Sequence, residues 1–345
     1  MSTPYRILVI GPSWIGDMMM AQSLFMLLKQ NNPDCCIDVL APGWSLPLLV
    51  HMPEVSEAIR SPFQHGEAGL RQRYLLGKSL RGRHYDQAVI LPNSMKSALV
   101  PYWARIPLRT GFVGEMRYGL VNDARKLNTD TLPKTVMRFT SLGLPARQTL
   151  PENIPLPRLA TNELDISASL DTLNLADTHT PVLALCPGAE FGPAKQWPAR
   201  HLATLANDRL DQGWRVWLLG SDKDVDICAS ITSSTNDRCK NLAGKTELGQ
   251  VIDLMSRATA IVSNDSGLMH IAAALDKPLV AIYGSSDPDF TPPLSNKVEI
   301  LSLRLSCSPC FKRKCPLGHL DCLNKLEPER VGNAIDLLLE KESND

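Results

Sequence analysis

Two stretches of this 345-residue chain repeat the same local pattern, and the repetition limits the folds that it can adopt. In each stretch a short, mostly apolar run ends in a loop that contains glycine or proline, and a helix-like segment follows. The runs at 6–10 and 182–186 are the clearest examples. Such runs are typical of parallel strands buried on both faces, and alternation of strands with helices favours a doubly wound sheet. The sequence therefore predicts an α/β protein with two similar halves.

Further runs fit the same pattern along the chain. Strands are expected at 6–10, 36–40, 88–91, 182–186, 215–219, 258–263 and 279–283, and helices at 17–30, 162–173, 201–212 and 328–341. The segment from 145 to 181 is rich in proline and polar residues, and we interpret it as the connection between the halves. We expect two Rossmann-like domains, at 1–160 and 161–327, that face each other across a cleft.

Composition and charge indicate the cellular location of the chain and the kind of partner it meets. No apolar run approaches the roughly 18–20 residues of a membrane span, and the first residues lack a secretory apolar region, so we expect a cytoplasmic protein. Residues 1–160 hold 18 Lys and Arg against 11 Asp and Glu, a net charge of +7, and the remainder carries −7. This asymmetry suggests that the first half meets an anionic partner, although chance variation between solvated faces explains it equally well.

The first motif is GPSWIGD at 11–17, between the first strand and the first helix. The glycine spacing of a dinucleotide fingerprint is absent, and Asp17 stands where a P-loop has lysine, so neither class of site is indicated. An acid at this position suits a general base that takes a proton from a hydroxyl. It also suits a simple cap on the helix dipole, which the spacing alone favours.

Two further motifs follow strands of the second half. In CPGAEFGPAKQWP at 186–198, small residues let a ligand approach the backbone and Lys195 could place a charge on a diphosphate, although a Gly/Pro loop with one lysine is common. In SNDSGLMH at 263–270, Asp265 or Ser266 caps a helix whose N-terminus can bind phosphate, Gly267 leaves room, and His270 lies one turn in. This convergence favours a ligand site over an ordinary capped helix.

Two weaker motifs remain open. In LGSDKD at 219–224, Asp222 or Asp224 could bind ribose hydroxyls, or both could belong to a solvated turn. Cys307, Cys310, Cys315 and Cys322 have spacing that could ligate zinc, but zinc ribbons separate their ligand pairs by longer stretches. We therefore favour reduced or redox-active thiols and expect no metal site.

Taken together, these motifs resemble the bacterial heptosyltransferase family, and the resemblance covers nearly the whole chain. The segments at 6–24, 186–198 and 263–293 resemble its N-terminal and donor-binding signatures, and those at 52–59, 91–101 and 109–120 resemble its type II rather than its type I members. The resemblance implies a GT-B fold in which the first domain binds an acceptor and the second a nucleotide sugar. It also implies that the final segment, 328–345, packs back on the first domain.

The resemblance further implies an activity and a set of site residues. The activity is inverting transfer of heptose from ADP-L-glycero-β-D-manno-heptose to the first heptose of the lipopolysaccharide inner core, with the enzyme peripheral on the inner membrane. Asp17 matches the catalytic base, and donor positions match Lys195, Asp265, Ser266, Gly267, Leu268, His270, Thr246 and one of Asp222 and Asp224. Acceptor candidates are Lys96, Arg105, Arg109 and Arg117. No cofactor is implied, and a divalent cation is left open.

Two alternative functions stay open from the sequence. Another GT-B enzyme of core oligosaccharide synthesis would share the fold but differ in its donor, which binding of ADP-heptose against UDP-sugars would reveal. A non-catalytic protein that binds nucleotide sugars would keep binding without turnover.

Overall fold

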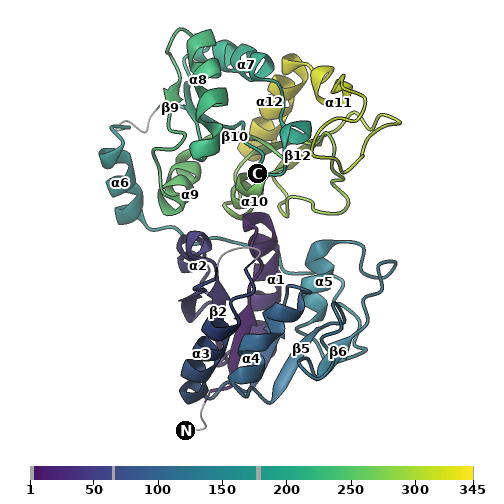
Figure 1. Cartoon of the computed structure of the whole chain (residues 1–345). Coiled ribbons are helices and arrows are strands. Elements are labelled where there is room, and N and C mark those ends of the chain that lie inside the picture. Colours follow the sequence, from purple (N-terminus) through teal and green to yellow (C-terminus); the bar gives the residue numbers. More distant parts are fainter. Residues whose placement is uncertain (1–3, 64–66, 176–179, 345) are drawn as a thin grey trace. The chain divides into compact units, whose positions relative to one another are not determined.

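The chain folds into two compact α/β units (Figure 1). A computed structural model describes residues 4–63, 67–175 and 180–344. The first unit ends at Pro157 and the second begins at Arg158, three residues before the predicted boundary. Among the described residues, no helix is long and apolar enough to cross a membrane.

The first unit contains six strands and five α-helices among its described residues. In chain order they are β1 (Arg6–Ile10), α1 (Ile15–Asn31), β2 (Cys36–Ala41), α2 (Leu46–Val50), β3 (Glu57–Arg60), α3 (Leu70–Leu80), β4 (Gln87–Ile90), α4 (Leu99–Trp103), β5 (Leu108–Phe112), β6 (Asp123–Arg125) and α5 (Thr135–Ser141). Strand β1 is buried on both faces from Ile7 to Ile10, which explains its unbroken apolar sequence.

The second unit repeats this plan with six more strands. Its elements are α6 (Glu163–Thr172), β7 (Val182–Cys186), α7 (Ala199–Asp211), β8 (Arg215–Leu218), α8 (Val225–Ser234), β9 (Lys240–Asn241), α9 (Leu248–Arg257), β10 (Ala260–Asn264), α10 (Gly267–Ala274), β11 (Leu279–Ile282), β12 (Val298–Leu301), α11 (Asp321–Asn324) and α12 (Pro328–Asn344). The polar N-cap Asn162 starts α6 by accepting a hydrogen bond from the Leu164 N–H at 2.9 Å.

Both sheets have the strand order of a Rossmann fold, as the sequence predicted. The first is ordered β3-β2-β1-β4-β5-β6 and the second β12-β11-β10-β7-β8-β9, which is the same order when strands are counted within each unit. All neighbouring strands pair in parallel. The order reverses between β1 and β4 and between β7 and β10, and ligands of such sheets bind at the carboxyl ends of the strands at this reversal.

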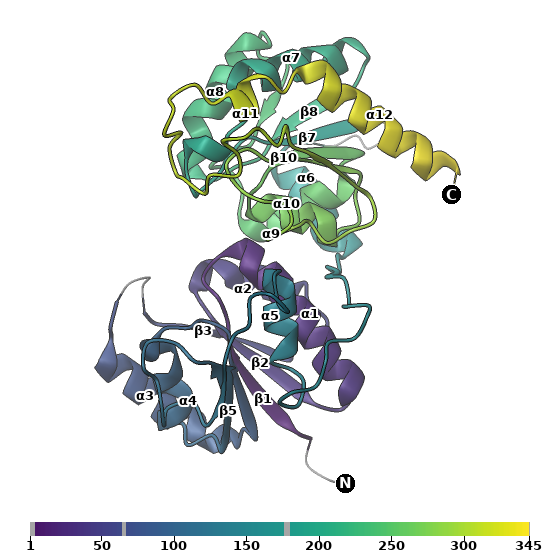
Figure 2. The ribbon, with the colours of Figure 1, turned by 90° about the vertical axis from the view of Figure 1, so that its right-hand side faces the viewer.

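Helices cover both faces of each sheet (Figures 1 and 2). In the first unit α1 packs with α5 and α3 packs with α4, and in the second α7 packs with α8 and α12 while α9 packs with α6 and α10. Leu8 and Ile10 of β1 point into one core cluster, and Leu183 and Leu185 of β7 occupy the corresponding place in the second unit. Each unit therefore has a core of its own.

The C-terminal helix α12 packs on the second unit. Its apolar residues Val331, Ala334, Ile335 and Leu338 have helical spacing, and all four are buried in the core cluster beside α7 and β11. At its edge the Asp336 carboxylate accepts a hydrogen bond from Arg209 at 2.7 Å. The apolar stripe of this helix is thus buried in the second unit's own core, and the expected packing of 328–345 on the first domain stays a prediction.

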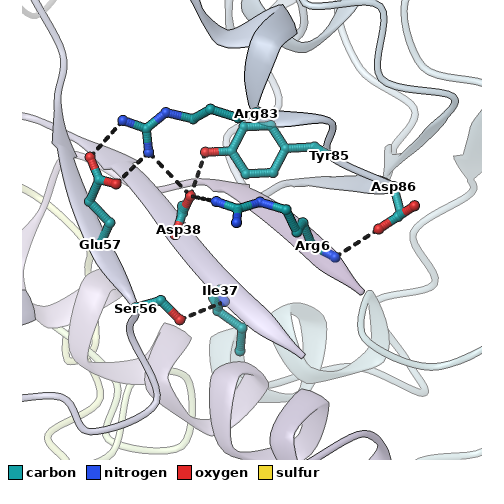
Figure 3. Close-up of polar contacts among 8 residues, drawn as sticks. All are labelled: Arg6, Ile37, Asp38, Ser56, Glu57, Arg83, Tyr85 and Asp86. Carbon is teal, nitrogen blue, oxygen red and sulfur yellow. Dashed lines mark hydrogen bonds and ion pairs between the residues drawn. The ribbon is translucent and has the colours of Figure 1, made fainter. Parts of the chain in front are cut away.

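A polar network joins β1, β2 and β3 near their amino ends (Figure 3). The buried carboxylate of Asp38 accepts hydrogen bonds from the Tyr85 hydroxyl at 2.6 Å and from Arg6 and Arg83 at 3.2 and 3.4 Å. Arg83 also pairs with Glu57, and that hydrogen bond lowers the pKa of the Glu57 carboxyl. Because ligands bind at the opposite ends of parallel strands, we assign this network to stability of the sheet.

Candidate functional site

In the second unit, two loops meet where the strand order reverses between β7 and β10. Asn264, the last residue of β10, joins them: its Oδ1 accepts a hydrogen bond from the Trp197 N–H at 3.0 Å, and its Nδ2 donates to the Pro187 carbonyl at 2.7 Å. Trp197 is fully buried and its indole N–H donates to the Leu326 carbonyl at 2.9 Å. The loop at 187–198 is thereby fixed against the start of α10.

Lys195 and Asp265 come together across this junction. The Lys195 ammonium donates a hydrogen bond to the Asp265 carboxylate, and the two form an ion pair. The Asp265 side chain is 5% exposed and that of Lys195 is 16% exposed. Lys195 Nζ also lies 5.1 Å from the centre of the Phe191 ring. The structure thus brings together two residues that are 70 positions apart and that two different motifs indicate as site residues.

The N-terminus of α10 lies directly after this ion pair. Ser266 precedes the helix in an extended conformation and makes no capping bond with its side chain, and its hydroxyl lies 3.3 Å from that of Ser263. Gly267 and Leu268 form the first turn and are partly exposed. The first N–H groups of any α-helix lack acceptors within the helix. This terminus could therefore receive an anionic group. That such a group binds here stays a prediction.

His270 lies one turn into α10 and is 5% exposed. The pKa of its imidazole is lowered to about 4, chiefly by burial; Asp265 opposes the shift and Lys195 adds a smaller part to it. The side chain is therefore neutral near pH 7 and contributes a hydrogen-bonding group but no positive charge to the site.

The candidates for the nucleoside differ in their surroundings. One oxygen of Asp224 accepts hydrogen bonds from both the N–H and the hydroxyl of Ser221 at 2.8 Å, so Asp224 serves as part of a capping box. Asp222 is exposed and lies beside Gly244. The Thr246 hydroxyl is buried and has no hydrogen-bond partner among the described residues. Of the two acids, Asp222 has the carboxylate more available for ribose hydroxyls.

In the first unit, Asp17 is the third residue of α1 and is half-buried, directly beyond the carboxyl end of β1. Lys96 is half-buried in a short 3-10 helix, Met95–Ala98, that follows β4, the strand next to β1 in the sheet. Both residues therefore lie at the carboxyl edge of the sheet beside its reversal point. This is the edge at which a doubly wound sheet binds its ligand.

The three arginine candidates of the first unit have different roles. Arg117 is only 2% exposed, and its guanidinium donates to the carbonyls of Phe112 and Pro92, both at 2.6 Å. Burial lowers the pKa of Arg117 and of Arg109, whose guanidinium donates to the carbonyls of Leu120 and Ile106. Arg117 and Arg109 therefore hold loops in place instead of offering donors to a ligand, and only Arg105 is exposed.

All nine cysteines are free thiols, and no cluster of three or more potential ligands able to hold a metal ion is found within 4–63, 67–175 and 180–344. Within the segment 307–322, Cys315 and Cys322 differ in character. Hydrogen bonds from backbone N–H groups, led by that of Leu320, lower the pKa of Cys315. Burial, followed by the charges of the other three cysteines of the segment, raises the pKa of Cys322.

Some residues of the site are not identified by the sequence motifs. The motif at 263–270 gives Asn264 no role of its own, although a polar residue that ends an apolar strand is a signal for a loop-fixing side chain. Ser285 and Ser286 follow β11, and their buried hydroxyls have no partner among the residues described. Nothing in the local sequence indicates that the Phe191 ring lies beside cations.

A family model of glycosyltransferase family 9 (heptosyltransferase) matches residues 73–321. The chain belongs to this family and is a glycosyltransferase of GT-B type. The doubled Rossmann topology and the site at the β7–β10 reversal agree with that assignment.

Individual relatives show which members of the family the chain is similar to. Lipopolysaccharide heptosyltransferase 2 of Salmonella typhimurium is 47% identical, with 98% of this chain and 99% of the relative covered, and that of Escherichia coli is 46% identical over the same shares. Among solved structures, E. coli ADP-heptose lps heptosyltransferase II has a TM-score of 0.88 at 45% identity, over 98% of this chain and 99% of that one. The chain is thus similar to type II heptosyltransferases over nearly its whole length.

Proposed function

We propose that this protein transfers L-glycero-D-manno-heptose from ADP-L-glycero-β-D-manno-heptose to the first heptose of the lipopolysaccharide inner core, with inversion at the anomeric carbon. The observation that carries the proposal is the convergence of Lys195, Asp265 and the start of α10 at one reversal point. The similarity to lipopolysaccharide heptosyltransferases 2 over 98% of the chain supports the choice of sugar and acceptor.

The second unit would hold the donor. Lys195 and the first N–H groups of α10, with Ser266 and Gly267, would bind the diphosphate by charge-assisted hydrogen bonds. Leu268, His270 and Asp265 would shape the site from the same loop and helix, while Asp222 would bind ribose hydroxyls and Thr246 would lie on the adenine side.

The first unit would supply the general base. Asp17 would accept the proton of the attacking acceptor hydroxyl while the oxygen of that hydroxyl forms a bond to the anomeric carbon. The bond from that carbon to the diphosphate oxygen breaks in the same step, and ADP leaves with the electron pair. Lys195 and the N–H groups of α10 would stabilise the charge that gathers on the leaving phosphate. One acid suffices, because a direct displacement with inversion needs no enzyme nucleophile.

The acceptor proposal concerns a phosphorylated, anionic lipid at a membrane surface. The net charge of +7 over residues 1–160 supports an anionic partner for the first unit. Lys96 and Arg105 are the exposed or half-exposed cations that we propose for direct contact. Arg109 and Arg117 would act by fixing the loops after β4 and β5.

The test is a transfer assay with ADP-heptose and heptosyl-Kdo2-lipid A, read by mass spectrometry of the lipid and NMR of the new linkage. We expect a mass increase of one heptose and inverted anomeric configuration. UDP-sugars serve as the donor control and should give no product. Donor binding without turnover would contradict the enzyme proposal, and a product of retained configuration would contradict the single displacement.

A further inference from the structure

The candidate donor site has a deficit of positive charge. Lys195 is paired with Asp265, so together they contribute no net charge, and His270 is neutral near pH 7 because burial lowers its pKa to about 4. A nucleotide-sugar diphosphate carries about two negative charges at this pH, since each phosphate of such an ester is strongly acidic. A site for it therefore calls for a further cation within reach of Lys195.

The cysteine-containing segment 307–322 is attached by its backbone to the site. The Phe311 N–H donates to the Ser285 carbonyl at 2.7 Å, at the end of β11. The Ala194 N–H, next to Lys195, donates to the Arg313 carbonyl at 3.1 Å. Main-chain hydrogen bonds thus hold this segment beside both loops, and one of them joins residues more than a hundred positions apart in the chain.

Gly192 makes this close approach possible. Its φ of 146° lies in a region that side chains rarely adopt, and a Cβ there would stand 2.6 Å from the Arg313 carbonyl oxygen and 3.2 Å from the Arg313 Cβ. Any other residue would push the segment away from the loop. The close approach of the segment 307–322 thus explains why position 192 is a glycine.

The side chain of Arg313 shares an aromatic surface with Lys195. Its guanidinium carbon lies 5.4 Å from the centre of the Phe191 ring, and Lys195 Nζ lies 5.1 Å from the same centre. Arg313 is exposed, and no carboxylate pairs with it in the parts of the chain that the structure describes. Two cations around one ring, only one of them neutralised, leave a net positive charge beside the α10 terminus.

We propose that Arg313 is a donor-binding residue that delivers the second cation for the diphosphate, an inference that rests on the proposed function. Its guanidinium presents a planar fork of donors that matches two phosphate oxygens. The segment 307–322 accordingly forms a wall of the donor site, and its backbone contacts to Ala194 and Ser285 set the position from which the fork reaches the ligand.

The test compares Arg313→Gln with Lys312→Gln, which removes the same charge from the neighbouring exposed position. Calorimetry with ADP and adenosine should show about 10-fold weaker ADP binding for Arg313→Gln, as expected for a lost hydrogen bond to a charged group. Adenosine binding should stay unchanged, and Lys312→Gln should alter ADP binding less than about twofold. The Arg313 carbonyl makes the backbone contact, so either variant should unfold at the wild-type urea concentration.

Other results would separate the failures. Equal loss of ADP affinity in Arg313→Gln and Lys312→Gln would mean that only the net charge of the segment matters, and it would overturn the proposal. Wild-type ADP affinity in Arg313→Gln would overturn it as well. Loss of adenosine binding or an earlier unfolding transition in Arg313→Gln would assign the residue to structure. Wild-type protein that fails to bind ADP would instead contradict the proposed donor site itself.

Discussion

The Lys195 ammonium donates a hydrogen bond to the Asp265 carboxylate and so joins the loop after β7 to the loop after β10. The pair lies where the order of the second sheet reverses, and its carboxylate is almost fully buried. Lys195 therefore has two possible partners, the carboxylate beside it and a diphosphate. A bound diphosphate would share the ammonium with Asp265, because a lysine carries three donors.

Lys195→Ala is expected to weaken ADP binding about 10- to 150-fold, the scale of a lost hydrogen bond between charged groups. The variant also leaves the buried carboxylate of Asp265 without its cation. The unpaired carboxylate would repel the phosphates and weaken binding further. Gly267→Val should have a similar effect because it blocks approach to the backbone of α10. Adenosine should bind both variants almost as well as it binds the wild type, and calorimetry with both ligands measures the difference.

A matched control for this experiment is Lys223→Ala, which removes an exposed lysine of the same unit that is paired with Glu190. Its ADP affinity should stay near that of the wild type. If Lys195→Ala lost affinity for adenosine and for ADP equally, Lys195 would support the fold or the binding of adenine and would not contact the diphosphate.

Asp17→Asn is expected to lower kcat about 10²–10⁴-fold with little change in ADP affinity, because the amide cannot accept the acceptor proton. The substitution keeps the size of the side chain at the third position of α1. Asp34→Asn, at an exposed acid of the same unit, is the control and should keep wild-type turnover. Steady-state kinetics with saturating donor make the comparison, and near-wild-type turnover of Asp17→Asn would remove Asp17 from its proposed role.

The sequence predicted the elements that are stabilised locally and missed those that depend on neighbours. The expected strands at 6–10 and 182–186 have the observed bounds, and the expected helix at 162–173 is α6 with one residue removed at each end. The edge strands β3, β6, β9 and β12 were missed because they are two to four residues long and carry polar residues. Such strands form by pairing with a longer strand, which no local pattern records.

The same distinction holds for the candidate site. The loops at 186–198 and 263–270 were predicted because strand, loop and cap signals follow one another in the chain. Burial could not be predicted for Arg117, whose guanidinium donates to carbonyls at the end of β5 and in the loop after β4. Nor could the approach of Arg313 to Phe191, since more than a hundred residues separate them. Long-range packing decides which charged residues face solvent.

Cys315 is expected to react with iodoacetamide at pH 7 before Cys322 and well before Cys186. Backbone N–H groups lower the pKa of Cys315, whereas burial raises the pKa of both other thiols, and the thiolate is the reactive form. Mass spectrometry of peptides after short exposure gives the order of labelling. Labelling of Cys322 as fast as Cys315 would contradict the assigned environments.

The same cysteines test the interpretation that the segment 307–322 is not a zinc site. Elemental analysis of purified protein should give less than one zinc or iron per chain. One tightly held metal per chain, with all four thiols protected from alkylation until a chelator is added, would show instead that these cysteines are ligands.

Asp38→Ala is expected to lower the free energy of unfolding by about 2–4 kcal/mol, because it leaves the buried Tyr85 hydroxyl and two arginines without their shared acceptor. Tyr85→Phe should cost only about 1 kcal/mol, since Asp38 then keeps both arginines. Urea unfolding measures both. The kcat of the folded variants should not change, as the network lies away from the carboxyl ends of the strands (Figure 3), and a specific loss of kcat in Tyr85→Phe would argue against a purely stabilising role.

Acid is expected to destabilise the second unit through His270. Its pKa is lowered to about 4 by burial, against about 6.5 in the unfolded chain, so the unfolded state binds the proton first as the pH falls. The stabilising effect of the neutral imidazole is complete above pH 6.5 and is lost between pH 6.5 and 4. At pH 5 this difference amounts to about 2 kcal/mol. Urea unfolding of the wild type and of His270→Gln at pH 7.5 and 5 isolates the contribution of His270 to the free energy of unfolding, because other groups titrate alike in both proteins. The wild type should lose about 2 kcal/mol more than the variant, and equal losses would mean that the imidazole is protonated in the folded protein.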